Sequence, residues 1–455
     1  MNYVTKLQHF LPKTIAFSYR QRWLSQLVNI QTVSPSDSNL KANNTNNNNN
    51  NNNIKQPFVP RYEFPQYNIT LTDFKGHQMK ALKNFQKLLP QLNMIIELRD
   101  IRAPLSTRNL LFDTLLSRTK KSSTLSKLII YTKKDLLSSS PQDPKKYLDK
   151  LIKWHNEINE KFIIMNCNHN KDIKTLMDLI NWQNNKFIKN PLPMGFRILI
   201  IGMPNVGKST LTNSLRSFAT HNDTDHHHHD KEKKNTVVAK TGGQAGVTRS
   251  ISECIRISND KSSSTMHGIY IVDSPGVGLP GRINNCQRML TLSLAGCIKD
   301  NLIDPIIQAD YLLYLINLQQ QLTGKKRNSH ELYPGSIQNP TNNVYEVLKR
   351  LKGKANINDN SMAMSWVDNW RQSRKGIIFD PELLLECDEF SLKDYLGNES
   401  KKIRTLYSDG MLNTTTTTTT TAANNNNNDN NGAKSKKKKK DKKVSSNNNN
   451  KLFIN

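Results

Sequence analysis

The segment Gly202-Met-Pro-Asn-Val-Gly207-Lys208-Ser209 restricts the possible folds of this chain more than any other, because of what flanks it. An apolar run at 196–201 precedes it, as in a buried strand, and a helical pattern at 209–218 follows. A glycine-rich turn between strand and helix aims successive backbone N–H groups at phosphates. We expect Lys208 to act on the transferring phosphoryl group and Ser209 to coordinate Mg²⁺. The expected nucleotide contacts here are Asn205, Val206, Gly207, Lys208, Ser209 and Thr210.

Two motifs of a nucleotide switch lie behind this phosphate loop. Asp273 ends an apolar run at 269–272 and begins Asp-Ser-Pro-Gly, so its carboxylate is expected to hold Mg²⁺ directly or through water. The N–H of Gly276 would sense the γ-phosphate, and we count it among the catalytic groups. Thr248, within Ala245-Gly-Val-Thr-Arg249, is the expected switch threonine, which completes the Mg²⁺ shell and acts in catalysis only when the γ-phosphate is present. An ordinary loop threonine is the alternative for Thr248.

The stretch Thr132-Lys133-Lys134-Asp135 has the pattern of a guanine-reading loop and follows an apolar run at 128–131. Asp135 can accept hydrogen bonds from N1–H and the exocyclic amine of guanine, which adenine does not match, so GTP is the expected nucleotide. The Lys133 stem would lie over the base, and Thr132 stands where Asn is more usual. The expected base contacts are Thr132, Lys133, Asp135, Asn166 and Cys167.

The guanine-reading loop precedes the phosphate loop, which is the reverse of the order in an ordinary GTPase and predicts a circularly permuted domain. Alternating strand and helix patterns predict an α/β fold with a doubly wound, mostly parallel sheet. Helical runs after Asp304 predict a small helical domain. The predicted organisation is a transit peptide and Asn-rich linker at 1–57, the permuted GTPase domain at 58–303 with a disordered insert at 220–235, a helical domain at 304–410, and a low-complexity Thr/Asn/Lys tail at 411–455.

A formal net charge of +28 favours polyanionic partners, and RNA is the natural candidate. The alternative is a generally basic protein with a solvated lysine tail. The five cysteines form no CxxC pair, so a zinc ribbon is not supported, and reduced, mostly buried thiols are expected.

The N-terminus is basic and free of acids until Asp37, with Lys6, Lys13, Arg20 and Arg22 among apolar and hydroxyl residues. This composition is typical of a mitochondrial transit peptide, and a disordered basic arm is the alternative. No apolar run approaches the ~18 residues that a membrane helix needs. We therefore expect residence in the mitochondrial matrix, with peripheral contact to the inner membrane left open.

Val277 occupies the place where many GTPases carry a water-positioning Gln, which predicts slow intrinsic hydrolysis. Two groups are candidates to compensate for the missing Gln. Asn205 is a candidate ligand for K⁺ beside the phosphates, and His77 is a candidate catalytic residue, although its position also suits the start of a helix.

The motif order, the segment Asp100-Ile-Arg102-Ala-Pro104 and the opening Phe74-Lys-Gly-His77-Gln-Met79 resemble the circularly permuted YlqF-type GTPases, over roughly residues 58 to 395. Within that group the chain looks most like the fungal mitochondrial ribosome-associated GTPases. The resemblance implies an assembly factor that binds the mitochondrial large subunit and its rRNA, leaves after GTP hydrolysis and thereby supports mitochondrial translation. It also implies that His77 acts in catalysis. We expect a monomer.

Two other functions compete with this one. A permuted GTPase of the small subunit is the first, but such relatives usually carry an N-terminal CxxC zinc motif, which is missing here. The second is a constitutive RNA-binding protein in which the nucleotide is structural. The switch elements at Thr248 and Asp273 argue against it.

Overall fold

Six strands form one sheet in a computed structural model of the chain, which describes residues 58–117, 125–137, 144–186, 194–221, 254–257, 268–323, 340–372, 376–384 and 390–408. The order across the sheet is β3-β2-β1-β4-β6-β5, and all neighbouring pairs are parallel except β5 and β6. The strands are β1 (Met94–Asp100), β2 (Ser126–Thr132), β3 (Phe162–Ile164), β4 (Phe196–Gly202), β5 (Ile255–Arg256) and β6 (Ile269–Asp273). The predicted mostly parallel α/β sheet is confirmed.

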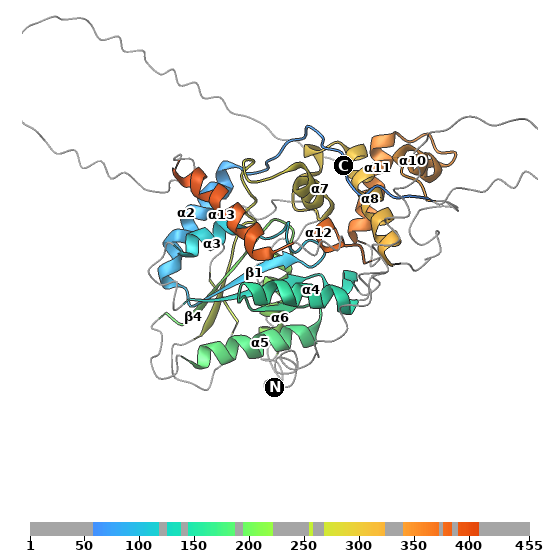
Figure 1. Cartoon of the computed structure of the whole chain (residues 1–455). Coiled ribbons are helices and arrows are strands. Elements are labelled where there is room, and N and C mark those ends of the chain that lie inside the picture. Colours follow the sequence, from blue (N-terminus) through green and yellow to red (C-terminus); the bar gives the residue numbers. More distant parts are fainter. Residues whose placement is uncertain are drawn as a thin grey trace, which may run out of the picture. The chain divides into compact units, whose positions relative to one another are not determined.

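The two central strands are buried because helices cover both faces of a parallel sheet, and β1 carries three buried charged residues. Every residue of β1 is buried, and β4 exposes only part of Arg197. The chain leads outward from β1 through β2 to β3 and then returns to β4 on the other side of β1. The connecting helices are α3 (Leu110–Ser117), α4 (Pro144–Glu157), α5 (Asn170–Asn185) and, after β4, α6 (Lys208–His221). Helices α5 and α6 contact each other, as Figure 1 shows below the sheet.

The direction of winding reverses between β1 and β4, which lie side by side with Leu98 opposite Gly202. Ligands of open α/β sheets bind in the crevice at such a reversal, beyond the carboxyl ends of the strands. Asp100 ends β1 and Gly202 ends β4. The topology therefore places the phosphate loop at the expected ligand-binding edge.

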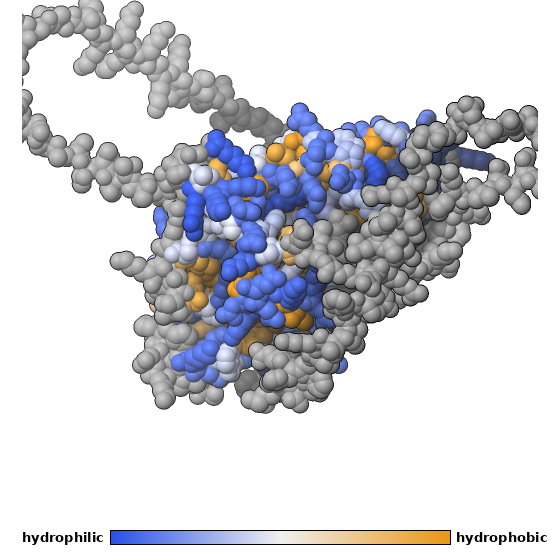
Figure 2. Space-filling model, viewed as in Figure 1, coloured by the Kyte–Doolittle hydropathy of each residue, from blue (hydrophilic) through white to orange (hydrophobic). Residues whose placement is uncertain are grey.

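Helices from the second half of the chain pack onto the α/β region. They are α7 (Cys286–Leu294), α8 (Pro305–Thr323), α10 (Val344–Lys352), α11 (Asp359–Gln372), α12 (Pro381–Leu384) and α13 (Leu392–Ser408). Helix α8 contacts α7, α11 and α12, and α13 contacts α3 and α4. In the view of Figure 2, hydrophilic residues cover much of the described surface, with smaller hydrophobic patches between them.

An N-terminal helix, α2 (Gly76–Leu88), continues into the short 3-10 turn η1 (Leu89–Gln91). Phe85 of α2 packs against Phe112 of α3, with ring centroids 6.0 Å apart. Two further 3-10 turns are η2 (Lys134–Leu137) and η4 (Asp300–Leu302). Among the described residues, no helix is long and apolar enough to cross a membrane.

Helix α6 extends further than predicted. It ends at His221, so Thr220 and His221 belong to a helix rather than to the predicted disordered insert at 220–235. The remainder of that insert lies outside the described residues, as do 1–57 and 411–455. Helices α3, α7 and α13 were not predicted from the sequence, although α13 is amphipathic.

Of the cysteines, Cys167, Cys286 and Cys297 are buried free thiols, whereas Cys254 is exposed.

Candidate functional site

The phosphate loop leaves β4 through a backbone that only particular residues adopt. Gly202 has φ +150°, and a Cβ there would lie 2.6 Å from the Leu98 carbonyl oxygen. Gly207 has φ +97°, and Asn205 takes the left-handed conformation with φ 57°. Glycine tolerates these angles because it lacks a Cβ. The two motif glycines therefore let the loop turn tightly between β4 and α6.

Lys208, Ser209 and Asp273 meet at the start of α6. The Lys208 ammonium is buried and donates a hydrogen bond to the Met203 carbonyl oxygen at 2.5 Å. Asp273 is also buried, and its carboxylate accepts hydrogen bonds from the Ser209 side chain and from the backbone N–H of Ser274. The predicted cation and both predicted Mg²⁺ ligands from this part of the chain are thus neighbours.

Burial shifts both charged groups of this cluster toward neutrality. It lowers the pKa of Lys208 to about 8, although the Asp273 carboxylate acts in the opposite direction. It also raises the pKa of Asp273, against the effect of Lys208 and of the hydrogen bonds from Ser274 and Ser209. The pair alone does not compensate its own desolvation. Anionic phosphate beside Lys208 and a divalent cation beside Asp273 would supply the missing interactions.

The loop after β6 lies against the phosphate loop. A Cβ on Gly276 would lie 2.5 Å from the Cα of Pro204, so this position has no room for a side chain. The Val277 N–H donates to the Gly202 carbonyl oxygen at 3.2 Å, and the Ser274 hydroxyl donates to the carbonyl of Ile200 at 2.6 Å. Val277 itself is fully buried, so its side chain offers nothing to a water molecule.

Thr132 connects the expected base loop directly to the phosphate loop. Its buried hydroxyl lies 2.7 Å from the Val206 carbonyl oxygen and 3.2 Å from that of Arg99, and can donate to either. This contact accounts for a small hydroxyl residue where Asn is more usual. Asp135 follows in η2. Burial raises the pKa of the Cys167 thiol to about 12, and the charge of Asp135 acts in the same direction. The Lys134 N–H donates to the carbonyl of Met165, next to Asn166, at 3.5 Å.

Asp100 is a member of the site that the pattern analysis did not identify. Its buried carboxylate accepts hydrogen bonds from Lys133 at 2.8 Å and from the Arg102 guanidinium at 2.9 and 3.1 Å. Although burial acts in the opposite direction, Arg102 and Lys133 hold the pKa of Asp100 well below its usual range. Lys133 itself is left-handed, with φ 62°. An acid at the end of the strand beside β2 was the available signal, because parallel strands end at the same edge.

Arg102 also joins this edge to the C-terminal helices. Its guanidinium donates to the Arg371 carbonyl oxygen at 2.9 Å and lies over the Phe379 ring, 4.7 Å from the centroid. Asp380 accepts hydrogen bonds from the backbone of Leu105 at 2.7 Å and from the hydroxyl of Ser106 at 2.5 Å. The segment after β1 is therefore fixed on one side by the base loop and on the other by Arg371, Phe379 and Asp380.

His77 lies at the start of α2, with its side chain exposed and no hydrogen bond to another described residue. Its neighbour Gln78 contacts the switch loop, since Gln78 Oε1 accepts a hydrogen bond from the Gly278 N–H at 2.7 Å. Asn109 supports the same loop by donating to the Val277 carbonyl oxygen at 2.7 Å. The structure brings α2 to the switch loop through Gln78 rather than through His77. Thr248 lies outside the described residues.

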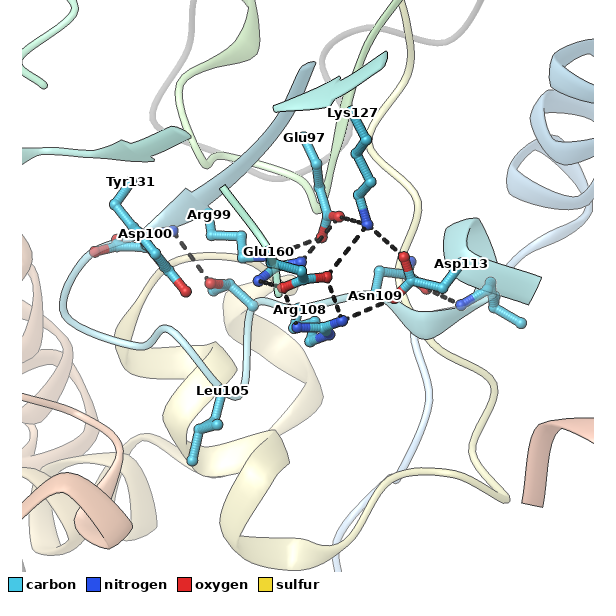
Figure 3. A network of polar contacts seen from close by, with 12 residues as sticks. Glu97, Arg99, Asp100, Leu105, Arg108, Asn109, Asp113, Lys127, Tyr131 and Glu160 are labelled. Carbon is cyan, nitrogen blue, oxygen red and sulfur yellow. Dashed lines mark hydrogen bonds and ion pairs between the residues drawn. The ribbon is translucent and has the colours of Figure 1, made fainter. Parts of the chain in front are cut away.

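A second cluster of charges is formed by residues of β1 and β2 together with residues of α3 and of the segments after β1 and before β3. Arg99 pairs with Glu97 at 2.8 Å and Lys127 pairs with the same carboxylate at 2.8 Å. Arg108 pairs with Glu160 at 2.7 Å. Figure 3 shows these side chains pointing toward one another, together with Asp113 of α3. We refer to Glu97, Arg99, Arg108, Asp113, Lys127 and Glu160 as the sheet cluster.

Comparison with known proteins agrees with this geometry. Residues 197–349 match the family model of the 50S ribosome-binding GTPases. The chain is 51% identical to mitochondrial GTPase 1 of Saccharomyces cerevisiae over 78% of its own length and 93% of that protein. It is 31% identical to mitochondrial GTPase 1 of Aedes aegypti, over 63% of this chain and 82% of the relative. It is also 31% identical to the mouse mitochondrial ribosome-associated GTPase 1, over 54% of this chain and 66% of that protein.

Proposed function

The chain belongs to the mitochondrial GTPase 1 family, and we propose that it binds GTP with Mg²⁺, hydrolyses the γ-phosphate and assists assembly of the mitochondrial ribosomal large subunit. The observation that carries the proposal is the meeting of Lys208, Ser209 and Asp273 beside the Thr132–Val206 contact. At this edge of the sheet, the side with Lys208 and Asp273 suits a triphosphate, and the side with Thr132 suits a guanine base. The names of the relatives support the mitochondrial and ribosomal setting.

In this proposal Lys208 holds the β- and γ-phosphates and neutralises charge that develops during transfer. Ser209 and Asp273 hold Mg²⁺, which supplies charge stabilisation at the phosphates. Their fit to the ion rests on the hydrogen bond between them and on the raised pKa of Asp273. Thr248 is the third proposed ligand. The Gly276 N–H contacts the γ-phosphate, which the close approach of Gly276 to Pro204 supports.

At the base, Asp135 selects guanine, and the Lys133 stem covers the ring, with Asp100 restraining the lysine. Thr132, Asn166 and Cys167 back this loop, and Asn205 to Thr210 line the phosphates. The order of these motifs supports a circularly permuted GTPase domain at 58–303, followed by a helical domain at 304–410. In that arrangement, residues that follow the switch loop continue directly into the C-terminal helices.

Hydrolysis is proposed to be slow until an external group assists, because Val277 is buried and apolar. Potassium is one candidate, and Asn205 is its proposed ligand. The Asn205 side chain packs closely against Gly296, where an added Cβ would lie 3.0 Å from the amide nitrogen. Equal turnover in KCl and NaCl would exclude this role. His77 is the other candidate. A His77→Ala variant with undiminished ribosome-stimulated turnover would remove it from the mechanism.

The proposed partner is the mitochondrial large subunit with its rRNA, and the proposed location is the matrix, with the chain acting as a monomer. The test is GTP turnover by the full chain in K⁺ buffer, with and without purified large subunits, beside a Lys208→Ala control. Stimulation that the control lacks supports the proposal. Stimulation by small subunits alone would replace the large-subunit role, and equal RNA affinity with GDP, a GTP analogue or no nucleotide would favour an RNA-binding protein with structural nucleotide.

A further inference from the structure

Helix α2 carries a basic face that the proposed chemistry does not use. Gln78, Ala81, Leu82 and Phe85 are buried against the core, whereas Lys80, Lys83 and Lys87 are exposed. The helix contains no acidic residue. None of the three lysines forms an ion pair with another described residue. Arg197 extends the positive charge, because its guanidinium donates at 2.7 Å to Gln91, one turn beyond Lys87.

The start of α2 is joined to the loop that follows Asp273. Gln78 bridges the two segments, accepting from the Gly278 N–H at 2.7 Å and donating to the Asp73 carbonyl oxygen at 2.9 Å. Asn284 donates at 2.9 Å to the carbonyl of Leu71, just before α2. Gly278 is two residues from Gly276, the proposed γ-phosphate contact. A change at the γ-phosphate therefore has a short, hydrogen-bonded route to this helix.

The chemistry of the exposed face favours a nucleic-acid backbone over other partners. A protein interface or a membrane surface needs apolar anchors, and no large exposed hydrophobic residue of the described chain belongs to α2. At about 1.5 Å per residue, Lys80 to Lys87 span about 10 Å. That length lets the three ammonium groups contact successive phosphates of one strand.

We propose that Lys80, Lys83 and Lys87 of α2 bind the phosphate backbone of RNA, and that the Gln78–Gly278 hydrogen bond makes this contact depend on the nucleotide. The inference rests on the proposed GTP switch and gives it an RNA-binding face. RNA bound on α2 stabilises the position of Gly278 that accompanies GTP, and GTP in turn strengthens RNA binding, because coupling between two sites is reciprocal.

The test measures binding of a fluorescent 24-base-pair RNA duplex by the full chain, with GDP or a non-hydrolysable GTP analogue, across a KCl series. RNA binding that does not depend on the nucleotide, including any by the lysine-rich tail, cancels in the ratio of the two affinities, so this ratio isolates the switched contact. For the wild type we expect this ratio to be about fivefold or more, the usual size of allosteric coupling. The triple variant Lys80→Gln/Lys83→Gln/Lys87→Gln should reduce the ratio to about one, and should lower the salt slope by about 2 to 3.

A matched control removes three cations from α10 and the turn after it, Lys349→Gln/Arg350→Gln/Lys354→Gln. These residues are also exposed and form no ion pair with a described residue. The control should keep the nucleotide ratio, and both triple variants should match the wild type in unfolding temperature and basal turnover. Equal loss of the ratio in both triples, or an unchanged ratio in the α2 triple, would overturn the proposal.

The Gln78–Gly278 hydrogen bond is tested separately, by substitution of Gln78. Gln78→Glu keeps the acceptor for the Gly278 N–H and loses only the donor to Asp73, whereas Gln78→Ala loses both. We expect Gln78→Ala to abolish the nucleotide ratio while keeping the salt slope, and Gln78→Glu to retain both. A ratio that survives in Gln78→Ala would overturn the coupling.

Large subunits then separate this inference from the proposed function. Wild-type turnover that large subunits do not stimulate would count against the assembly role, whatever the duplex measurement shows. Stimulation that is equal in the wild type and the α2 triple would overturn the RNA-binding face alone. Stimulation lost in the α2 triple with unchanged duplex binding would assign the face to a protein and overturn the inference.

Discussion

The sheet cluster and the Lys208–Asp273 pair differ in how far their charges are compensated by neighbouring charges. The sheet cluster contains three cations and three anions in mutual contact. The Lys208–Asp273 pair at the phosphate loop has one cation and one anion, and its hydrogen bonds with Met203, Ser209 and Ser274 involve neutral groups. Arg99 and Lys127 hold the pKa of Glu97 at about 2 against the effect of burial, whereas burial outweighs Asp273 and lowers the pKa of Lys208 to about 8.

The difference separates a completed structural network from a binding site. Ion pairs inside a protein stabilise it only when their mutual attraction repays the loss of hydration. In the sheet cluster every charge has an opposite neighbour. At the phosphate loop the attraction is insufficient, and the proposed Mg²⁺ and triphosphate would complete it. Four predictions test this distinction.

The largest expected effect is on folding, from Arg99→Met in the sheet cluster. It leaves Glu97 buried without its main partner, which typically costs about 3–5 kcal/mol. Denaturant unfolding measures it, with exposed Lys174→Met as the control. The double variant Glu97→Leu/Arg99→Met should regain much of the loss, because two cations and two anions remain. A loss below about 1 kcal/mol in the single variant would contradict the structural role of the cluster.

Lys208→Met should have the opposite effects, with a large loss of turnover and no loss of folding stability. Loss of one electrostatic contact to the transferring group lowers kcat by about 10²- to 10³-fold, or about 2.7–4 kcal/mol. Without ligands, the variant should be at least as stable as the wild type, because an uncompensated buried cation is removed. Single-turnover hydrolysis and ligand-free thermal unfolding measure the two effects. A variant as destabilised as Arg99→Met would show that Lys208 belongs to the same class as the sheet cluster.

Asp100→Asn should weaken GTP and GDP binding to a similar extent, by about tenfold for a lost charged hydrogen bond. The reason is that Lys133 loses the carboxylate that restrains it, while the phosphate loop is unchanged. At saturating GTP, kcat should stay within about twofold of wild type if Asp100 acts through the base loop alone. Asp113→Asn, within the sheet cluster, is the matched control and should leave both affinities unchanged. Equal effects of the two variants would refute a positioning role for Asp100.

The last prediction concerns the pH dependence of stability, where the two groups act on opposite sides of neutrality. Folded Glu97 keeps its charge down to about pH 2, whereas its ordinary pKa is 4.5. Its stabilising contribution is therefore complete above pH 4.5 and disappears as the pH falls to about 2. Folded Lys208 releases its proton near pH 8 instead of 10.5, so its destabilising effect is greatest below pH 8 and vanishes toward pH 10.5.

Chemical unfolding at several pH values, comparing wild type with Glu97→Gln and with Lys208→Met, measures both dependences. The stability gap for Glu97→Gln should close in acid, and that for Lys208→Met should close in alkali. Parallel curves for the wild type and Lys208→Met across pH 7–10 would contradict the low pKa of Lys208.

Most elements that form the nucleotide edge could be predicted from local pattern. The apolar runs at 128–131, 196–201 and 269–272 lie within β2, β4 and β6, and each is followed by the motif assigned to it. Helix α7 was missed because nearly all its residues are buried, polar ones included, so its sequence has no clear amphipathic period. Helix α3 was missed because its eight residues are mostly apolar and too few to establish a period. The boundary at Thr220 was missed because helix α6 continues into polar sequence.

The sequence by itself determined the class of sheet and the positions and order of the phosphate loop and of the predicted base loop. These features are local, because each depends on residue types at fixed spacing along a few turns of chain. The tertiary structure decided that Thr132 joins the two loops, that Asp100 restrains Lys133, and that Gln78 connects α2 to Gly278. Partners separated by 33 to 200 positions cannot be read from spacing, since only the packing of the strands and helices brings their atoms together.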